Sequence, residues 1–212
     1  MFTGIIEDVG KIVRVGSGTL SIDTLLDGIG VGDSLAVNGI CLTVNSIIQQ
    51  GSSLRPSFNF SPETAAVTTI GGLRPGSPVN VERALRADGR FGGHIMTGHI
   101  EGTSRLWKKQ REGNSHIFTF QSVRALERYI VPKGSIGVDG ISLTVLESRN
   151  GFFSVSLIPY TLEQTNLREM VVGQAVNIEP DLLAKYAESL LTAAPRPKPV
   201  TEETLRQNGF LK

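Results

Sequence analysis

The chain has 212 residues, of which 40% are hydrophobic, enough for one large core or two small ones. Its formal net charge is +1 and no basic block stands out, which argues against nucleic acid and acidic membrane surfaces as partners. A single cysteine excludes an internal disulfide, and with no signal sequence and no apolar run near the ~20 residues of a membrane span, we expect a soluble, cytoplasmic protein.

The chain contains the same series of segments twice. Residues 3–7, "TGIIE", return at 97–101 as "TGHIE", and "VNGICLTV" at 37–44 returns at 138–145 as "VDGISLTV". The stretch 61–82 then has its counterpart at 158–179. Three matches in the same order indicate two homologous modules of about 95 residues, a period too long for a solenoid repeat.

Short runs of β-branched and aromatic residues fill each module. In the first module they lie at 11–23, 34–47, 55–61 and 77–83, and they are separated by Gly, Pro, Asn and Asp. Such runs predict strands, and the Asn-Gly and Asp-Gly pairs between them favour tight hairpins. Closing each set of strands into an antiparallel barrel removes exposed strand edges, so we expect an all-β fold of two small barrels in tandem.

Three segments are predicted to be helical. Residues 61–70 and 158–167 each contain a proline that suits a first helical turn, and each is only a turn or two long. Residues 181–193 place an apolar stripe on one helical face, with Asp181 at the N-cap. That stripe packs either on the chain's own barrels or on other subunits, and the prolines of 194–200 end the helix.

The expected organisation is therefore linear. We predict a first barrel at 1–93, a second barrel at 94–180, a C-terminal helix at 181–192 and a Pro-rich tail at 193–212.

Comparison of the two copies separates scaffold from candidate chemistry. Positions that are equal in both, including Gly39 and Gly140 or Glu82 and Glu179, are most simply scaffold. Positions that differ are candidates for a role, and these pairs are Ile5 and His99, Asn38 and Asp139, Cys41 and Ser142, and Ser61 and Ile158. Reactive side chains are thus distributed unequally, with a thiol in the first copy and an imidazole and a hydroxyl in the second.

Each reactive residue also has a simpler interpretation. A lone Cys41 is most often a small buried hydrophobe. His94 and His99 lie five apart without an acidic or Cys ligand cluster, so no metal site is predicted. Ser142 lacks the flanking glycines of a nucleophile elbow. The glycines of 89–93, "GRFGG", lack a phosphate-loop lysine and are interpreted as a flexible linker.

Several longer motifs resemble one family closely. They are "MFTGIIE", "VNGICLTV", "NVERAL", "GGHIMTGHIEG", "KGSIGVDGISLTV", "LIPYTLEQTNL" and "VNIEPD". Together they span residues 1 to about 190 in the order found in the riboflavin synthase family. The resemblance implies two six-stranded Greek-key barrels, each binding one lumazine, and a homotrimer joined by C-terminal helices. It also implies an active site between the N-terminal barrel of one subunit and the C-terminal barrel of its neighbour.

The reaction implied by the resemblance is a dismutation that ends riboflavin biosynthesis. One 6,7-dimethyl-8-ribityllumazine donates four carbons to another, which gives riboflavin and 5-amino-6-ribitylaminouracil, and the enzyme is a transferase that needs no cofactor. Two identical substrates with opposite roles need pockets of the same shape and different catalytic groups, which accounts for unequal copies. The alternative is a non-catalytic lumazine- or flavin-binding protein of the same fold.

The resemblance carries site residues over by position. The catalytic and near-site positions are Phe2, Ser34, Cys41, His99, Ser142, Thr144 and Asp181. The lumazine-binding positions are Gly4, Ile5, Ile6, Cys41, Leu42, Thr43, Asn59, Phe60, Ser61, Pro62, Glu63, Thr64, Gly98, His99, Ile100, Lys133, Ser142, Leu143, Thr144, Ser156, Leu157, Ile158, Pro159, Tyr160 and Thr161. His99 is a candidate proton shuttle, and Cys41 or Ser142 is a candidate to add to the acceptor ring, directly or through a water.

The sequence leaves other questions open. It does not separate nucleophile from base, and it does not fix the symmetry of the trimer or the orientation of the two rings. Association with lumazine synthase and the role of the tail are also left open.

Overall fold

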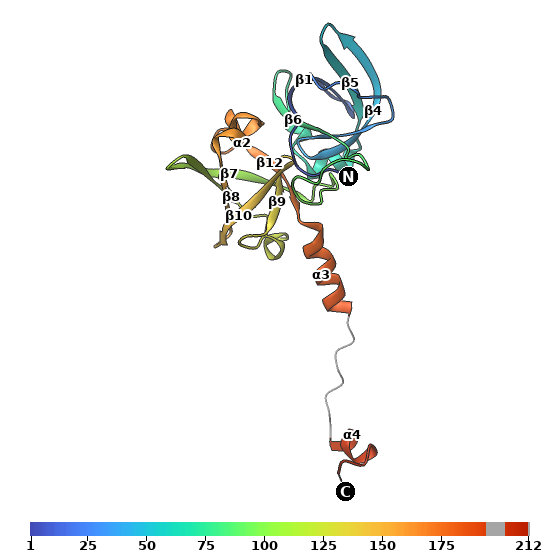
Figure 1. The fold of residues 1–212 in the computed structure, drawn as a ribbon, viewed down its shortest axis with the longest axis vertical. Coiled ribbons are helices and arrows are strands. Elements are labelled where there is room, and N and C mark those ends of the chain that lie inside the picture. Colours follow the sequence, from blue (N-terminus) through green and yellow to red (C-terminus); the bar gives the residue numbers. More distant parts are fainter. Residues whose placement is uncertain (194–201, 212) are drawn as a thin grey trace. The chain divides into compact units, whose positions relative to one another are not determined.

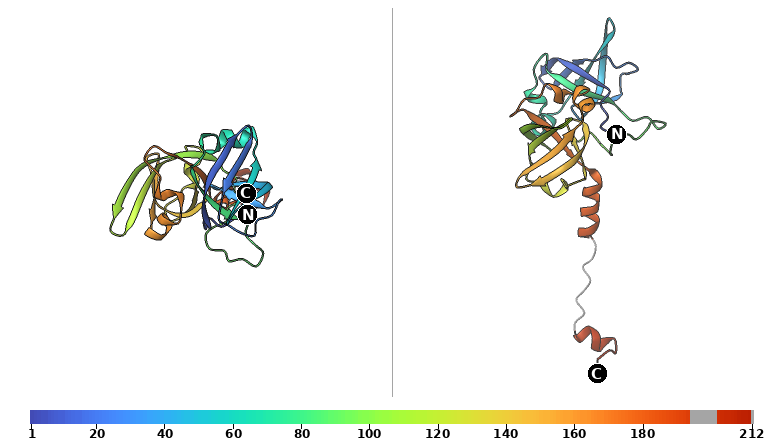
Figure 2. Two further views of the ribbon diagram at one scale, coloured as in Figure 1. Left: turned by 90° about the horizontal axis from the view of Figure 1, so that it is seen from above. Right: turned by 60° about the vertical axis from the view of Figure 1, so that its left-hand side comes forward.

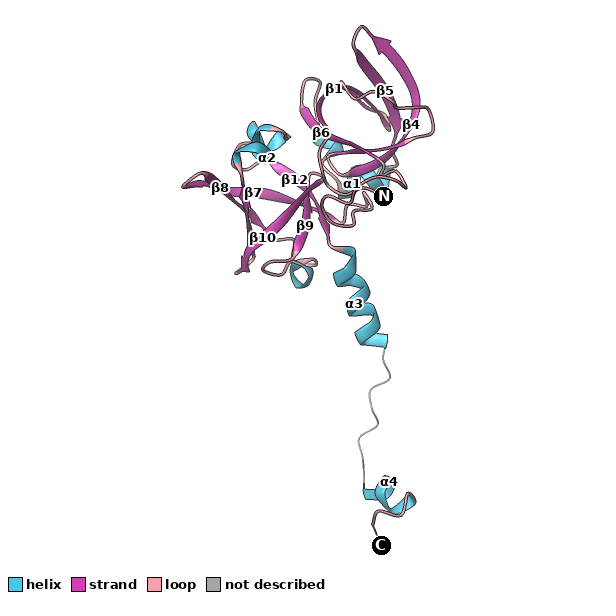
Figure 3. Cartoon of the chain, in the orientation of Figure 1, coloured by secondary structure: helices cyan, strands magenta, loops and turns pink. Residues whose placement is uncertain are grey.

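The structure is a computed structural model that describes residues 1–193 and 202–211. The chain divides into two units, Met1–Leu182 and Leu183–Lys212, and each is described by itself. Within the described residues, every strand belongs to the first unit, as the magenta arrows of Figure 3 show. The predicted Pro-rich tail lies partly outside the described residues.

The first module forms one closed barrel (Figure 1). Its strands are β1 (Asp8–Gly16), β2 (Thr19–Asp23), β3 (Ser34–Val37), β4 (Ile40–Gln50), β5 (Ser53–Asn59) and β6 (Pro78–Arg83). They follow one another around the barrel as β1-β2-β5-β4-β3-β6, and all neighbours are antiparallel.

The second module repeats this barrel. Its strands are β7 (Gly102–Glu112), β8 (Ser115–Gln121), β9 (Ser135–Val138), β10 (Ile141–Arg149), β11 (Phe152–Leu157) and β12 (Ala175–Pro180). Their order around the closed barrel, β7-β8-β11-β10-β9-β12, matches that of the first. Even the register shifts recur, at Val44/Ser46 in β4 and at Val145/Glu147 in β10. The prediction of two homologous six-stranded antiparallel barrels is confirmed, and Figure 2 shows them from two further directions.

Strand alternation fills each barrel. In β4 the side chains of Ile40, Leu42 and Val44 are buried in the interior of the first barrel, whereas Cys41 and Thr43 belong to the other face of the strand. In the second barrel Phe120 and Phe153 stack with ring centroids 5.3 Å apart. The reactive positions of β4 and β10 are therefore presented on the outside of tightly packed barrels.

Two hairpin turns meet where the barrels touch. Asn38 and Gly39 join β3 to β4 with φ of 47° and 77°, and Asp139 and Gly140 join β9 to β10 with φ of 45° and 81°. Asn, Asp and Gly are the residues that tolerate this left-handed conformation. A Cβ added to Gly140 would lie 2.6 Å from the backbone nitrogen of Gly39. The prediction of tight Asn-Gly and Asp-Gly hairpins is confirmed, and their glycines also allow the barrels to approach.

A buried amide network joins the barrels around these turns. The Asn80 side chain of β6 donates to the Asp139 carbonyl, and the Asn177 side chain of β12 donates to the Asn38 carbonyl, both at 2.9 Å. The side-chain amide of Asn166 donates to Oδ1 of Asn38 at 3.2 Å and to Oδ2 of Asp139 at 3.0 Å. Asn38 and Asp139, which comparison of the copies marks as candidates for a role, are therefore structural residues of the interface.

The short helices lie where the sequence predicts them. α1 (Pro62–Val67) and α2 (Pro159–Glu163) each begin at a proline and are followed by single 3-10 turns, η1 (Ile70–Gly72) and η3 (Asn166–Arg168); a third turn, η2 (Glu127–Tyr129), precedes β9. The Ser61 hydroxyl accepts the N–H of Thr64 at 3.0 Å and caps α1. Ile158, at the same position before α2, makes no side-chain cap.

The second unit contains two helices. α3 (Leu182–Ala193) is the predicted C-terminal helix, and its Tyr186, Leu190 and Leu191 side chains are exposed. α4 (Glu202–Gln207) was not expected from the sequence. Its two glutamates lie in the first turn and Arg206 in the last, an arrangement that complements the helix dipole.

Candidate functional site

The first candidate pocket lies on the outer face of β4. The N–H of Cys41 donates to the carbonyl of Gly98 at 2.9 Å. A Cβ added to Gly98 would lie 2.5 Å from the Cβ of Cys41, so only glycine fits this approach. The segment 98–100, which begins the second copy, therefore lies on the thiol-bearing strand of the first.

The second candidate pocket repeats this arrangement with the copies exchanged. The N–H of Ser142 in β10 donates to the carbonyl of Gly4 at 2.8 Å, and a Cβ added to Gly4 would lie 2.7 Å from the Cβ of Ser142. Phe2 and Met96, which precede the two glycines, exchange backbone hydrogen bonds of 2.8 and 3.1 Å. Each pocket is thus built from residues of both modules. The predicted division into barrels at 1–93 and 94–180 does not describe this sharing.

Strand pairing also brings predicted binding residues to each pocket, 59–64 to the first and 156–161 to the second. Val44 lies opposite Phe58, so Thr43 is next to the end of β5 and the residues 59–64 that follow it. Val145 lies opposite Val155, which brings residues 156–161 next to Thr144 in the same way. The predicted binding positions therefore gather into two sets, one around Cys41 and one around Ser142.

Other predicted residues lie around these sets. Phe2 is buried against Ala36 and Met96, with Cys41 at the edge of the cluster. Ser34 is paired with Thr43 across β3 and β4. The N–H of Lys133 donates to the Val145 carbonyl at 2.8 Å.

His99 is an exposed residue directly after Gly98. Its N–H lies 3.4 Å from the Thr97 hydroxyl, and it directly follows the glycine whose carbonyl accepts the N–H of Cys41. An exposed position suits exchange of protons with a bound molecule or with solvent.

His94 is a further candidate site residue, which the sequence alone did not indicate. Its Nδ1 lies 2.7 Å from Oγ of Ser142, and the residue is only 7% exposed. Burial lowers the pKa of His94 below its ordinary value, although the charge of Asp181 opposes that shift. A neutral imidazole with its proton on Nε2 would accept the Ser142 hydroxyl proton and make that oxygen a better nucleophile or acceptor.

The glycines before His94 correct one expectation. "GRFGG" was interpreted as a flexible linker, but a Cβ added to Gly93 would lie 2.0 Å from the Thr3 carbonyl oxygen and 2.7 Å from the Ser142 Cβ. Gly93 is therefore a close-packing position of the second pocket. The partner residues lie far away in the sequence, so local pattern gave no signal of this contact.

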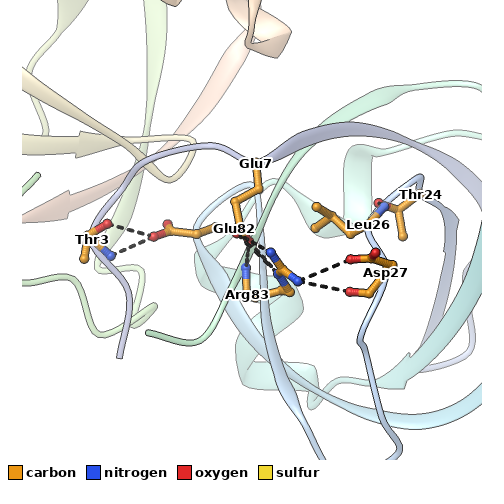
Figure 4. Close-up of polar contacts among 7 residues, drawn as sticks. All are labelled: Thr3, Glu7, Thr24, Leu26, Asp27, Glu82 and Arg83. Carbon is orange, nitrogen blue, oxygen red and sulfur yellow. Dashed lines mark hydrogen bonds and ion pairs between the residues drawn. The ribbon is translucent and has the colours of Figure 1, made fainter. Parts of the chain in front are cut away.

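A cavity of about 590 Å³ includes two of the predicted site positions in its lining. Ser34, Ile5, Arg83 and Arg90 are among its lining residues, whereas Cys41 and Ser142 are not. Figure 4 shows the ion pairs of the lining residue Arg83, including the one with Glu7, whose Oε1 lies 2.8 Å from Nη2 of Arg83. Burial raises the pKa of Glu7, but the Arg83 hydrogen bonds and charge outweigh it and leave the pKa below the ordinary value.

Two further observations concern residues 1–193 and 202–211. No group of three or more His, Cys, Asp or Glu side chains there is arranged to hold a metal ion. None of the helices in that part of the chain is both long and apolar enough to cross a membrane.

Comparisons with known proteins agree with this architecture. The model of the lumazine binding domain family matches residues 3–84 and 97–181, one match for each barrel. Riboflavin synthase of Actinobacillus pleuropneumoniae is 42% identical, in an alignment that covers 99% of this chain and all of that protein. Riboflavin synthase of Mycobacterium tuberculosis (strain ATCC 25618 / H37Rv) is 41% identical over 92% of this chain and all of its own length.

A solved structure has the same fold at lower sequence identity. LumP complexed with riboflavin superposes with a TM-score of 0.73 at 23% identity, covering 85% of this chain and 99% of the other. That likeness concerns the fold alone.

Proposed function

The chain belongs to the riboflavin synthase family and contains two lumazine binding domains, and we propose that it converts two molecules of 6,7-dimethyl-8-ribityllumazine into riboflavin and 5-amino-6-ribitylaminouracil. It is an enzyme, a transferase that moves a four-carbon unit from one lumazine to the other. The atoms of the two substrates equal those of the two products, so the reaction needs no further co-reactant.

The observation that carries this proposal is the pair of equivalent positions on β4 and β10 with unequal chemistry. Cys41 and Ser142 occupy the same position in β4 and β10, and each lies under a glycine of the other copy, Gly98 or Gly4. One lumazine must accept a nucleophile on its ring while the other loses a proton from its C7 methyl. Two sites with the same backbone arrangement and different reactive groups suit two identical molecules with these opposite roles.

We assign roles by the chemistry of each group. Ser142, hydrogen-bonded to the neutral His94, is suited to activate or add to the acceptor lumazine, directly or through a water. Cys41 is the alternative nucleophile, for an acceptor lumazine that binds in the first pocket instead. The exposed His99, which directly follows Gly98, is suited to move the methyl proton.

Assembly of the chain is part of the proposal. Tyr186, Leu190 and Leu191 of α3 are 58%, 74% and 79% exposed, which is typical of a helix face that contacts another chain. We propose a cytoplasmic homotrimer joined through α3, in which the pocket around Cys41 in one subunit faces the pocket around Ser142 in the next.

The alternative function is binding of a lumazine or flavin without turnover. The fold shared with LumP is compatible with it. The full-length relatives at 42% and 37% identity are riboflavin synthases, and both pockets here retain their reactive groups, which favours the enzyme.

The proposal is tested by incubating the purified chain with 6,7-dimethyl-8-ribityllumazine alone. We expect riboflavin and 5-amino-6-ribitylaminouracil to form in equal amounts, one of each for two substrates consumed, as followed by absorbance and product chromatography. Tight binding of the substrate without product would contradict the enzyme and support the binding protein.

A second prediction concerns Lys133, which has φ of 67° where the first copy has a glycine, Gly32, at the corresponding hydrogen bond to β4. A left-handed conformation costs a non-glycine residue roughly 1–2 kcal/mol. We expect Lys133→Gly to raise the free energy of unfolding by about 1 kcal/mol, because strain is released, and to weaken lumazine binding, because a cation of the second pocket is lost.

The matched control is Asn150→Gly. Asn150 has φ of 52° in the exposed hairpin between β10 and β11 and lies outside both pockets. It should not weaken lumazine binding in a calorimetric titration. Unchanged affinity in Lys133→Gly would remove Lys133 from the site.

A further inference from the structure

Each barrel carries a buried glutamate on its last strand. Glu82 of β6 and Glu179 of β12 are 5% and 3% exposed. Both were assigned to the scaffold because they are equal in the two copies. A buried carboxylate is costly unless it is fully hydrogen-bonded, so the groups that surround it indicate what it is for.

The partners of both carboxylates are backbone amides at the pocket glycines. Glu82 accepts the Thr3 N–H at 2.8 Å, the Thr3 hydroxyl at 3.1 Å and the Gly4 N–H at 3.0 Å, as Figure 4 shows for Thr3. Glu179 accepts the Thr97 N–H at 2.6 Å, the Thr97 hydroxyl at 2.8 Å and the Gly98 N–H at 3.1 Å. The two glutamates thus hold the same Thr-Gly pair in the same way.

The glycine that each glutamate holds serves the opposite barrel. Glu82 belongs to the first barrel, but the carbonyl of Gly4 accepts the N–H of Ser142 in the second. Glu179 belongs to the second barrel, but the carbonyl of Gly98 accepts the N–H of Cys41 in the first. A carboxylate in one barrel therefore sets the position of the segment that completes the pocket of the other.

We infer that Glu82 and Glu179 are positioning residues that act crosswise, Glu82 on the pocket around Ser142 and Glu179 on the pocket around Cys41. This inference rests on the proposed function only in so far as those pockets are the active site. The crossed geometry itself is independent of the reaction.

Replacing each glutamate by glutamine, which has the same shape, tests the hydrogen bond from the carboxylate to the glycine N–H. In Glu179, Oε1 accepts both donors of Thr97 and Oε2 accepts the Gly98 N–H. Glutamine keeps one acceptor oxygen, and its NH₂ would then face the Gly98 N–H as a second donor. Glu179→Gln therefore releases Gly98 while keeping the volume of the side chain. Glu82→Gln removes the 3.0 Å contact of Oε2 with the Gly4 nitrogen but keeps the weaker one at 3.2 Å to Oε1, so it releases Gly4 less completely.

The only cysteine of the chain provides a readout that does not depend on turnover. Gly98 covers the Cβ of Cys41, so release of Gly98 exposes the thiol. In the full-length protein we expect Glu179→Gln to raise the rate of Cys41 alkylation by iodoacetamide at least threefold. Glu82→Gln should leave that rate within about twofold of the wild type, even if both variants are destabilised to the same extent.

Turnover gives the complementary result. With 6,7-dimethyl-8-ribityllumazine we expect both variants to lose at least tenfold in kcat, with a smaller change in KM, because misplaced backbone affects orientation more than binding. Equal effects of the two variants on Cys41 alkylation, or an effect of Glu82→Gln alone, would overturn the crossed assignment. If Glu179→Gln alone raises the Cys41 alkylation rate but the wild type shows no turnover, only the proposed function is contradicted.

If the glutamine variants do not fold, a pair of less disruptive substitutions gives the same test. Thr97→Val removes one hydroxyl donor to Glu179, and Thr3→Val removes the corresponding donor to Glu82. Thr97→Val should raise the alkylation rate of Cys41 above that of Thr3→Val. The reverse order would overturn the inference.

Discussion

Replacing Gly140 by alanine is expected to lower the free energy of unfolding by about 3–5 kcal/mol. The new Cβ would lie 2.6 Å from the backbone nitrogen and 2.9 Å from the Cα of Gly39, and neither atom can rotate away. Alanine would also be strained at φ of 81°. Since the two hairpins meet at the barrel interface, both pockets should lose their shape, and urea denaturation measures the loss.

The control for this substitution is Gly113→Ala. Gly113 also has a left-handed φ, 58°, in the hairpin between β7 and β8, but nothing lies within 4 Å of an added Cβ. Only the conformational cost of roughly 1–2 kcal/mol should appear. If Gly140→Ala and Gly113→Ala destabilise the protein equally, the close approach of the two hairpins does not contribute to stability.

Asp139 is expected to make the protein less stable as the pH rises. Burial raises the pKa of Asp139 from 3.8 to about 7, although hydrogen bonds from Asn177 and Asn166 oppose the shift. Between these two values the folded state holds a proton that the unfolded state has released, so the free energy of unfolding falls as the pH increases. A difference of about 3 pKa units corresponds to a loss on the order of 4 kcal/mol between pH 4 and pH 7.

The variant Asp139→Asn isolates this contribution. Other carboxyls titrate in the same range, and burial raises the pKa of Glu82 and Glu179 as well. The comparison therefore concerns the difference between wild type and variant, measured by urea denaturation at several pH values. The wild type should lose stability relative to Asp139→Asn as the pH rises from 4 to 7, and the difference should level off above pH 7. Parallel curves for the two proteins would show that Asp139 keeps an ordinary pKa.

Much of the fold could be predicted from local sequence patterns and from the duplication. The Asn-Gly and Asp-Gly pairs need left-handed backbone, which only a few residues adopt, so both hairpins could be predicted. The prolines at 62 and 159 fix the starts of α1 and α2. Barrel closure follows from many short strands that would otherwise leave edges unpaired.

The composite nature of the pockets could not be predicted in this way. Comparison of the copies aligns Cys41 with Ser142, but it does not show that Gly98 covers one and Gly4 the other. The contact between His94 and Ser142 joins residues 48 positions apart and leaves no periodic signal. For the same reason, the difference between Asn38 and Asp139 suggested chemistry, although its neighbours Asn80, Asn166 and Asn177 make it a feature of the interface.

The most direct test of two composite lumazine pockets is a crystal structure of this protein with riboflavin, the reaction product. We expect two bound ring systems in each chain, one against Cys41 and Gly98 and the other against Ser142 and Gly4. A single flavin bound in the cavity of about 590 Å³ that Ser34, Arg83 and Arg90 line, with neither Cys41 nor Ser142 in contact, would contradict that assignment.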